Sequence, residues 1–311
     1  MKYLNLIRWP NLMIMLFTMM LLRHMVIVPR LALAGIDPNT NNLVFFLYAL
    51  STLLIAAGGY IVNDIMDIDV DRVNKPDKMI VTKTVSMSMA EKLYYGLTIA
   101  GSITGIAIGL LVSNWMLGLV FPVVAGAMWF YSKRYKRMLL IGNLVVSFST
   151  AILLVLVWVV EFFALSNQPE SFTHAISVMP EITGFVIAYA LFALLATMLR
   201  EIIKDIEDME GDAKGGCRTF PVMYGMQPAK NLCIALLTTL IIMIGFWQYI
   251  LYFQHYTQAM IFLFLALALS ILLLLRLALA SLPVHFSQAS LLTKLLMLAG
   301  ILSLIFVLPN A

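Results

Sequence analysis

Long apolar runs separated by short polar segments form the main pattern of this chain. A helix needs about 20 predominantly apolar residues to cross the hydrocarbon core of a membrane. Nine runs approach or exceed this length, with Ser113 and Asn114 as the only break between the third and fourth. The predicted spanning helices cover residues 9–29, 42–64, 92–113, 115–132, 139–160, 180–204, 228–252, 258–280 and 289–309. The pattern therefore predicts an all-α, polytopic membrane helical bundle with one domain over residues 1–311.

The composition supports this prediction. Hydrophobic residues make up 62% of the 311 residues and charged residues 12%, against about 45–50% and about 25% in soluble globular chains. A surplus of this size excludes a water-soluble nucleotide-binding enzyme, because a soluble chain cannot bury so much apolar surface. The two cysteines exclude a disulfide scaffold. Nucleic-acid binding is not expected either, because membrane topology explains the net charge of +4.

The basic residues indicate how the chain is oriented. With a cytoplasmic N-terminus and nine crossings, the cytoplasmic segments are the N-terminus and the loops after even-numbered helices. Of the 20 lysines and arginines, only Arg23 and Arg30 fall on the other side, which leaves 18 (20 − 2). We therefore expect a cytoplasmic N-terminus. Since no organelle-targeting extension precedes the first helix, the plasma (inner) membrane of a prokaryote is the expected location.

The acidic residues cluster in two patches. Of the 16 carboxylates, six lie in residues 64–91 and six in residues 201–212. Both patches lie at the predicted cytoplasmic ends of helices, the second and the sixth. In the first patch, Asn63, Asp67 and Asp71 stand four residues apart and would share one face of a helix. Like charges at this spacing repel each other, so the pattern predicts a bound cation that compensates them.

The second patch repeats this arrangement. Asp205, Asp208 and Asp212 are spaced by three and four residues, with Arg200 and Lys204 beside them. A solvated helix end would explain one such patch, but two in a charge-poor membrane chain indicate function. Carboxylate and amide oxygens are ligands that suit Mg²⁺, which commonly binds substrate phosphates as well. Two Mg²⁺-binding faces suit ionisation of an allylic prenyl diphosphate. Apolar walls would then shield the resulting carbocation from water.

These motifs resemble a known family. The NDxxDxxxD pattern at 63–71, the DxxxD pattern at 208–212 and nine helices are similar to the UbiA superfamily of intramembrane prenyltransferases. The segment RWPN at 8–11 is similar to the family's RPxN-like start of the first helix. YSKRYKR at 131–137 and GN at 142–143 are similar to its YSxxLKR loop and the GN that follows. The resemblance covers essentially the whole chain.

The resemblance implies a Mg²⁺-dependent enzyme and a role for each candidate residue. The expected metal ligands, including two supporting carboxylates, are Asn63, Asp64, Asp67, Asp71, Asp205, Asp208 and Asp212. Those expected to act in catalysis are Asp67, Asp71, Asp208 and Asp212. The residues expected to bind the diphosphate or the acceptor are Arg8, Asn11, Lys75, Lys133, Lys136, Arg137, Lys204 and Arg218. The partners implied are a prenyl diphosphate, a lipid or aromatic acceptor and membrane lipid.

The residues around the motifs narrow the range of expected acceptors. DRVNKPDK at 71–78, KDIEDMEGD at 204–212 and RTFP at 218–221 resemble archaeal-type digeranylgeranylglyceryl phosphate synthases. Such enzymes transfer a geranylgeranyl group to the glycerol hydroxyl of geranylgeranylglyceryl phosphate. The segment 78–83 departs from their pattern, because it lacks the proline and the glycine found there. An aromatic quinone precursor of the 4-hydroxybenzoate or naphthoate type is therefore the alternative acceptor.

Two other classes of protein fit the pattern less well. A secondary transporter would explain nine helices, but it predicts charges near the bilayer midplane and repeats between the halves. The charges in this chain lie at the cytoplasmic ends of helices instead. A membrane scaffold without catalytic activity would not need two acidic faces.

Overall fold

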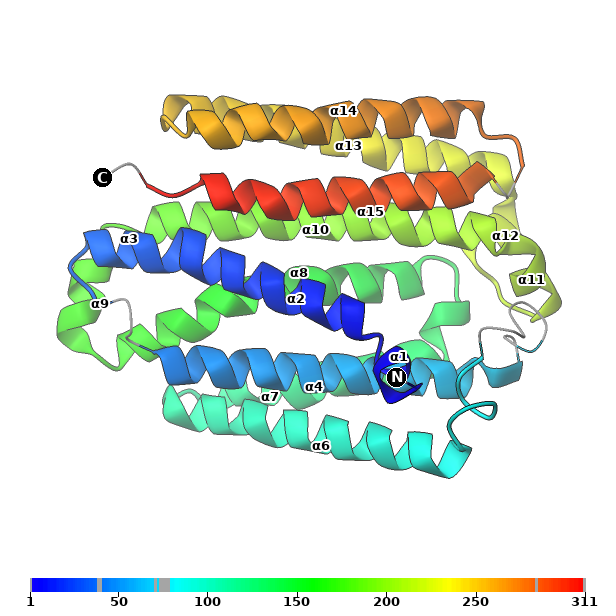
Figure 1. Cartoon of the computed structure of the whole chain (residues 1–311), viewed down its shortest axis with the longest axis horizontal. Coiled ribbons are helices and arrows are strands. Elements are labelled where there is room, and N and C mark those ends of the chain that lie inside the picture. Colours follow the sequence, from blue (N-terminus) through cyan, green and yellow to red (C-terminus); the bar gives the residue numbers. More distant parts are fainter. Residues whose placement is uncertain (1, 38–40, 70–71, 73–78, 283–284, 310–311) are drawn as a thin grey trace. The chain divides into compact units, whose positions relative to one another are not determined.

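The computed structural model describes residues 2–37, 41–69, 72, 79–282 and 285–309 (Figure 1). In this part of the chain, nine helices are long and apolar enough to cross a membrane, as the apolar runs predict. The first span, Trp9–Leu33, consists of α2 (Trp9–Leu21), the π-helical η1 (Leu22–Ile27) and α3 (Val28–Leu33). The other spans are α4 (Asn42–Met66), α6 (Met87–Leu111), α7 (Trp115–Lys133), α8 (Ile141–Ser166), α10 (Met179–Glu207), α13 (Met226–Phe253), α14 (Thr257–Leu279) and α15 (His285–Ser303), which η4 (Leu304–Phe306) continues. The short helices are α1 (Lys2–Leu6), η3 (Tyr135–Arg137), α9 (Pro169–Ala175), α11 (Met209–Lys214) and α12 (Phe220–Tyr224).

Several helices extend beyond the apolar runs that predicted them. The third span begins at Met87 rather than residue 92, because Ser86 caps it by accepting a hydrogen bond from the backbone N–H of Met89 at 3.4 Å. The predicted break between the third and fourth spans is confirmed. There Ser113 has a positive φ of 54°, and Asn114 caps α7 by accepting from a backbone N–H at 3.2 Å.

The long helices carry large apolar side chains on their outer faces. Leu110 is 69% exposed, Val123 68% and Leu279 77%. A soluble protein rarely exposes many such side chains over continuous surfaces. Together with the length and apolar composition of the spans, they give each long helix a face suited to contact with lipid.

One compact unit comprises Met1–Arg23, Leu31–Lys136 and Val155–Pro180. Within it, α4, α6 and α7 lie side by side (Figure 1). The backbones of α6 and α7 approach so closely that a Cβ atom on Gly109 would lie 2.6 Å from the backbone nitrogen of Gly118. Small residues permit such close packing between membrane helices. The packing holds the end of α4, which carries the first acidic motif.

The other compact unit comprises His24–Arg30, Arg137–Leu154 and Glu181–Ala311. In it α14 packs against both α13 and α15. A Cβ atom on Gly300 would lie 2.4 Å from the ring of Phe192, so α15 also approaches α10 closely. The end of α10 carries the second acidic motif, and each motif therefore has its own helical support.

The two arginines that depart from the basic pattern are both buried. In the first unit, Arg23 is 1% exposed and its Nε atom lies 3.4 Å from a carboxylate oxygen of Glu161, which is itself 3% exposed. Asn41 donates a second hydrogen bond to this carboxylate at 3.1 Å, and the Arg23 guanidinium lies 4.8 Å from the ring centroid of Phe45. A charge inside a membrane protein requires such compensation.

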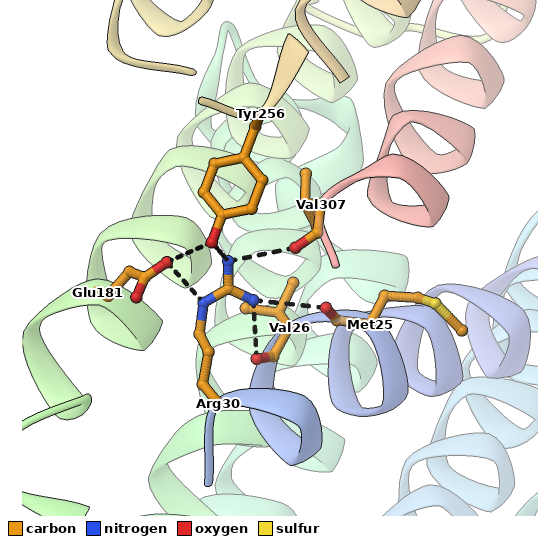
Figure 2. Close-up of polar contacts among 6 residues, drawn as sticks. All are labelled: Met25, Val26, Arg30, Glu181, Tyr256 and Val307. Carbon is orange, nitrogen blue, oxygen red and sulfur yellow. Dashed lines mark hydrogen bonds and ion pairs between the residues drawn. The ribbon is translucent and has the colours of Figure 1, made fainter. Parts of the chain in front are cut away.

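Arg30 is fully buried in the second unit and is at the centre of a polar network (Figure 2). Its Nε atom donates to Glu181 at 2.9 Å, and its Nη2 atom donates to the Tyr256 hydroxyl at 2.7 Å and to the carbonyl of Val307 at 3.2 Å. The Nη1 atom donates to the carbonyl of Val26 at 3.0 Å. The network thus joins the first span to α10, α14 and the segment after η4.

Tyr256 links the two charges of this network. Burial, together with the neighbouring Glu181 carboxylate, raises the pKa of Tyr256 to about 12. The hydroxyl therefore keeps its proton at neutral pH. It donates a hydrogen bond to Glu181 at 2.7 Å and accepts one from Arg30. Every group in this chain of hydrogen bonds has a partner, as buried polar groups require.

Replacing Arg30 with methionine is expected to lower the free energy of unfolding by about 3 kcal/mol, because the change breaks a buried ion pair. We place the effect at the lower end of the usual range, since the Glu181 side chain is 36% exposed and water can partly compensate it. Thermal unfolding of the purified protein in detergent measures the change. Arg276→Met is the matched control, because Arg276 is exposed on α14. Equal losses of stability in both variants would contradict the role of the network.

Candidate functional site

The first acidic motif spans the end of α4, with Asn63 in its last turn. Asp67 follows the last residue of α4, and its backbone N–H donates to the carbonyl of Asn63 at 3.0 Å. The amide of Asn63 in turn donates to Asp67 Oδ2 at 2.8 Å. Lys136, in η3, donates to Asn63 Oδ1 at 3.3 Å and forms an ion pair with Asp67 Oδ2. Three of the residues predicted from sequence therefore meet at one point.

Asp64 lies beside this group and pairs with a different cation. Its carboxylate accepts a hydrogen bond from Arg8 at 2.7 Å. Arg8 precedes α2 with a left-handed backbone, φ 51°, and its guanidinium lies 5.1 Å from the ring centroid of Tyr60. Burial lowers the pKa of Arg8, but the Asp64 carboxylate outweighs this effect and holds the pKa above its ordinary value. The structure thus brings both predicted residues, Arg8 and Asp64, to the end of α4.

The other candidates of the first unit are more dispersed. Asn11 is exposed in the first turn of α2. Lys133 is exposed at the end of α7, where its ammonium lies 4.4 Å from the ring centroid of Trp129. The predicted metal ligand Asp71 and the predicted substrate ligand Lys75 lie outside the described residues.

The second acidic motif belongs to the other unit. Asp205 lies in the last turns of α10, and its Oδ2 atom accepts a hydrogen bond from the amide of Asn143 at 2.8 Å. Asn143 is itself buried, near the start of α8. Asp205 is half-buried, and a carboxylate partly removed from water is stabilised by such a donor, so Asn143 supports Asp205 directly.

The helix expected to carry the whole second motif is interrupted. α10 ends at Glu207, and α11 begins one residue after Asp208. Backbone hydrogen bonds still connect the motif, since the N–H of Asp208 donates to the carbonyl of Lys204 at 2.9 Å and the N–H of Asp212 donates to that of Asp208 at 2.9 Å. The break at Asp208 (φ −92°, ψ 5°) turns the chain there, so the three carboxylates do not share one continuous helix.

The backbones of two predicted substrate-binding residues are adjacent in the same unit. The backbone N–H of Arg218 donates to the carbonyl of Arg137 at 2.8 Å. The segment after α11 and the residue that ends η3 are therefore adjacent within the second unit. Their side chains add positive charge that suits a phosphate.

The residues of the first motif fit a Mg²⁺ ion. Oxygens of Asn63 and Asp67 both contact the Lys136 ammonium, so a cation already occupies the point on which these two oxygens converge. Carboxylate and amide oxygens are the ligands that Mg²⁺ prefers. Among the described residues, no group of three or more histidine, cysteine, aspartate or glutamate side chains is close enough to form a metal cage by itself. The two oxygens of Asn63 and Asp67 therefore suit an ion that also takes substrate oxygens as ligands.

Two side-chain contacts in these sites could not be predicted from the sequence. Asn143 stands out only as part of the GN pair, and its bond to Asp205 joins residues 62 positions apart. The pairing of Arg8 with Asp64 joins residues 56 positions apart. The only available signal is their presence in motifs similar to those of the family, because helix packing, rather than spacing, creates the contacts.

Comparison with known proteins identifies the family. Residues 24–296 match the model of the UbiA prenyltransferase family. The chain belongs to this family. Family membership and the nine apolar helices among the described residues make it an integral membrane protein.

Individual relatives agree with this assignment. The chain is 33% identical over 195 residues to a digeranylgeranylglyceryl phosphate synthase of Ignicoccus hospitalis, a match that covers 63% of this chain and 59% of that relative. This match therefore spans less than two thirds of the relative's length.

The fold also resembles solved structures. A structure of digeranylgeranylglyceryl phosphate synthase has a TM-score of 0.62 and 24% identity, covering 98% of this chain and 96% of the other. A UbiA homologue from Archaeoglobus fulgidus bound to GPP and Mg²⁺ has a TM-score of 0.56 and 18% identity, covering 98% and 99%. At these identities the likeness concerns the fold, and it extends over nearly the whole chain.

Proposed function

We propose that this chain catalyses Mg²⁺-dependent transfer of a geranylgeranyl group from an allylic diphosphate to the glycerol hydroxyl of geranylgeranylglyceryl phosphate. The observation that carries the chemistry is the convergence of Asn63 and Asp67 oxygens on a cation at the polar end of a membrane span. Membership of the prenyltransferase family supports the reaction class. The name of the Ignicoccus relative supports the acceptor.

The residues have distinct proposed roles. The ligands of one Mg²⁺ are proposed to be Asn63, Asp67 and Asp71, and those of another Asp208 and Asp212, with Asp64 and Asp205 in support. The groups proposed to bind the diphosphate or the acceptor phosphate are Arg8, Asn11, Lys75, Lys133, Lys136, Arg137, Lys204 and Arg218. When bound, Mg²⁺ supplies positive charge that stabilises the departing diphosphate. The single domain over residues 1–311 is proposed as the catalytic unit.

The proposed reaction is balanced in bonds and protons. The bond between C1 of the prenyl chain and the diphosphate oxygen breaks, and the diphosphate leaves with the bonding electrons. The acceptor oxygen forms a new ether bond to C1 and releases its proton. The spanning helices supply an apolar environment in which the prenyl cation is shielded from water. The products are the ether lipid, diphosphate and a proton.

An acceptor competition tests this proposal. Purified protein in detergent receives geranylgeranyl diphosphate and Mg²⁺ together with geranylgeranylglyceryl phosphate, 4-hydroxybenzoate and a naphthoate, and mass spectrometry identifies the product. The proposal predicts the ether lipid alone. Product from an aromatic acceptor only would support prenyl transfer but overturn the proposed acceptor. This outcome is tested because residues 78–83 depart from the synthase pattern.

We further propose that the chain lies in the plasma membrane of a prokaryotic cell and that both acidic motifs face the cytoplasm. The proposal is supported by the basic residues, of which 18 (20 − 2) are predicted from the sequence to lie on the side that carries the motifs. Labelling of intact cells with a membrane-impermeant maleimide tests it. Lys92→Cys at the exposed start of α6 is expected to stay unlabelled and Thr173→Cys in exposed α9 to be labelled. The reverse pattern would overturn the orientation.

A further inference from the structure

Lys136 contacts the two oxygens that the first motif would offer to a metal ion. Its ammonium contacts Asn63 Oδ1 at 3.3 Å and forms an ion pair with Asp67 Oδ2. Asp67 is buried, with 7% of its surface exposed. A buried carboxylate needs a positive partner, and Lys136 supplies that charge from within the protein.

An ammonium and a divalent ion compete for these two oxygens. Mg²⁺ binds oxygen ligands at about 2.0–2.1 Å in a demanding octahedral geometry, and it loses its own water reluctantly. Two cations at one carboxylate would also repel each other strongly. We infer that Lys136 is the counter-ion of Asp67 whenever Mg²⁺ is not bound there, and that Lys136 must leave before Mg²⁺ binds. The inference rests on the proposed function and adds an order of binding to it.

The position of Lys136 permits this exchange. Its side chain is 33% exposed and stands on η3, a single turn of three residues after α7. Lysine carries its charge on a flexible four-carbon stem, so the ammonium can move without a change in the helices. A diphosphate bound at the motif offers the ammonium new oxygen partners of opposite charge. Mg²⁺ therefore binds well together with diphosphate and weakly to the protein alone.

Binding of Mn²⁺, used as a spectroscopic substitute for Mg²⁺ in the absence of any diphosphate, tests the inference. The free ion is followed by electron paramagnetic resonance with purified protein in detergent. Lys136→Met is expected to bind Mn²⁺ at least about tenfold more tightly than the natural protein, because the competing charge is gone. Lys136→Arg, which keeps the charge, is expected to stay within about twofold of the natural protein. Adding Asp67→Asn to Lys136→Met is expected to abolish the gain.

A matched control separates this competition from a general effect of charge. Lys92→Met removes the same charge from an exposed position in the same unit, and it is expected to leave Mn²⁺ affinity unchanged. Equal affinity of Lys136→Met and the natural protein, with Mg²⁺-dependent turnover of the natural protein intact, would overturn the inference alone. If neither protein binds Mn²⁺ and turnover needs no metal, the proposed function fails as well. An affinity gain that survives Asp67→Asn would also overturn the inference.

Discussion

Asp67→Asn is expected to lower the rate of prenyl transfer by about 10³-fold while the protein remains folded. Asparagine keeps the shape of the side chain but removes the charge that a metal ion needs, and loss of such electrostatic stabilisation has effects of this order. The fold should persist, because the backbone hydrogen bond from Asp67 to Asn63 is unaffected and Lys136, at 33% exposure, can reach water. Initial rates with saturating Mg²⁺ measure the effect, and size-exclusion chromatography checks the fold.

The matched control for this prediction is Asp69→Asn. Asp69 lies two positions further along the chain, and its side chain is 92% exposed in a surface pair with Arg72. An exposed pair of this kind contributes little to stability. The Asp69 variant is therefore expected to keep its rate within about twofold. Near-normal turnover in Asp67→Asn would contradict the assignment of the first motif.

The second large effect is expected from Asp208→Asn. Asp208 stands at the break between α10 and α11, where a half-buried carboxylate is proposed to hold the second metal ion. Loss of its charge is expected to lower the rate by about 10²-fold or more. The exposed Glu210 provides the control variant Glu210→Gln, which is expected to retain activity. Similar losses in both variants would indicate a general effect of charge instead.

The double variant Asp67→Asn with Asp208→Asn tests whether the two motifs act on one substrate. Residues that act as a unit are strongly non-additive, so the second change should lower the rate by much less than it does alone. Rates of the natural protein, both single variants and the double variant complete the cycle. Losses that multiply in full would contradict joint action on a single diphosphate.

The membrane architecture could be predicted because its signal is local. In a chain that is 62% hydrophobic, an apolar run of about 20 residues by itself indicates a helix that crosses the membrane. Helix ends were less predictable, since polar caps extend helices past the apolar run. The start of α6 illustrates this, because Ser86 fixes the helix start ahead of the exposed Lys92.

The candidate site was predictable as a set of residues but not as a set of contacts. Spacing of four residues correctly placed Asn63 beside Asp67. The partner Lys136 lies 69 positions away and reaches Asp67 only because α4 and α7 pack together. Long-range pairing of this kind depends on helix packing, which periodicity does not specify.

The buried arginines show the same limit. Arg23 and Arg30 stand out in the sequence as exceptions to the basic pattern, yet nothing nearby identifies a partner for either. Arg30 pairs with Glu181, which is 151 positions away. An ionisable residue inside a membrane span requires compensation, so the sequence supports the expectation of a partner without naming it.

Transfer of a labelled prenyl group is the most direct test of the central claim. Purified protein is incubated with radiolabelled geranylgeranyl diphosphate and geranylgeranylglyceryl phosphate, with Mg²⁺ or with EDTA, and both lipid-linked label and released diphosphate are quantified. We predict equal amounts of ether lipid and diphosphate with Mg²⁺, and neither with EDTA or in Asp67→Asn. Failure to release diphosphate from any prenyl donor, or release that is unaffected by EDTA and by Asp67→Asn, would contradict the account.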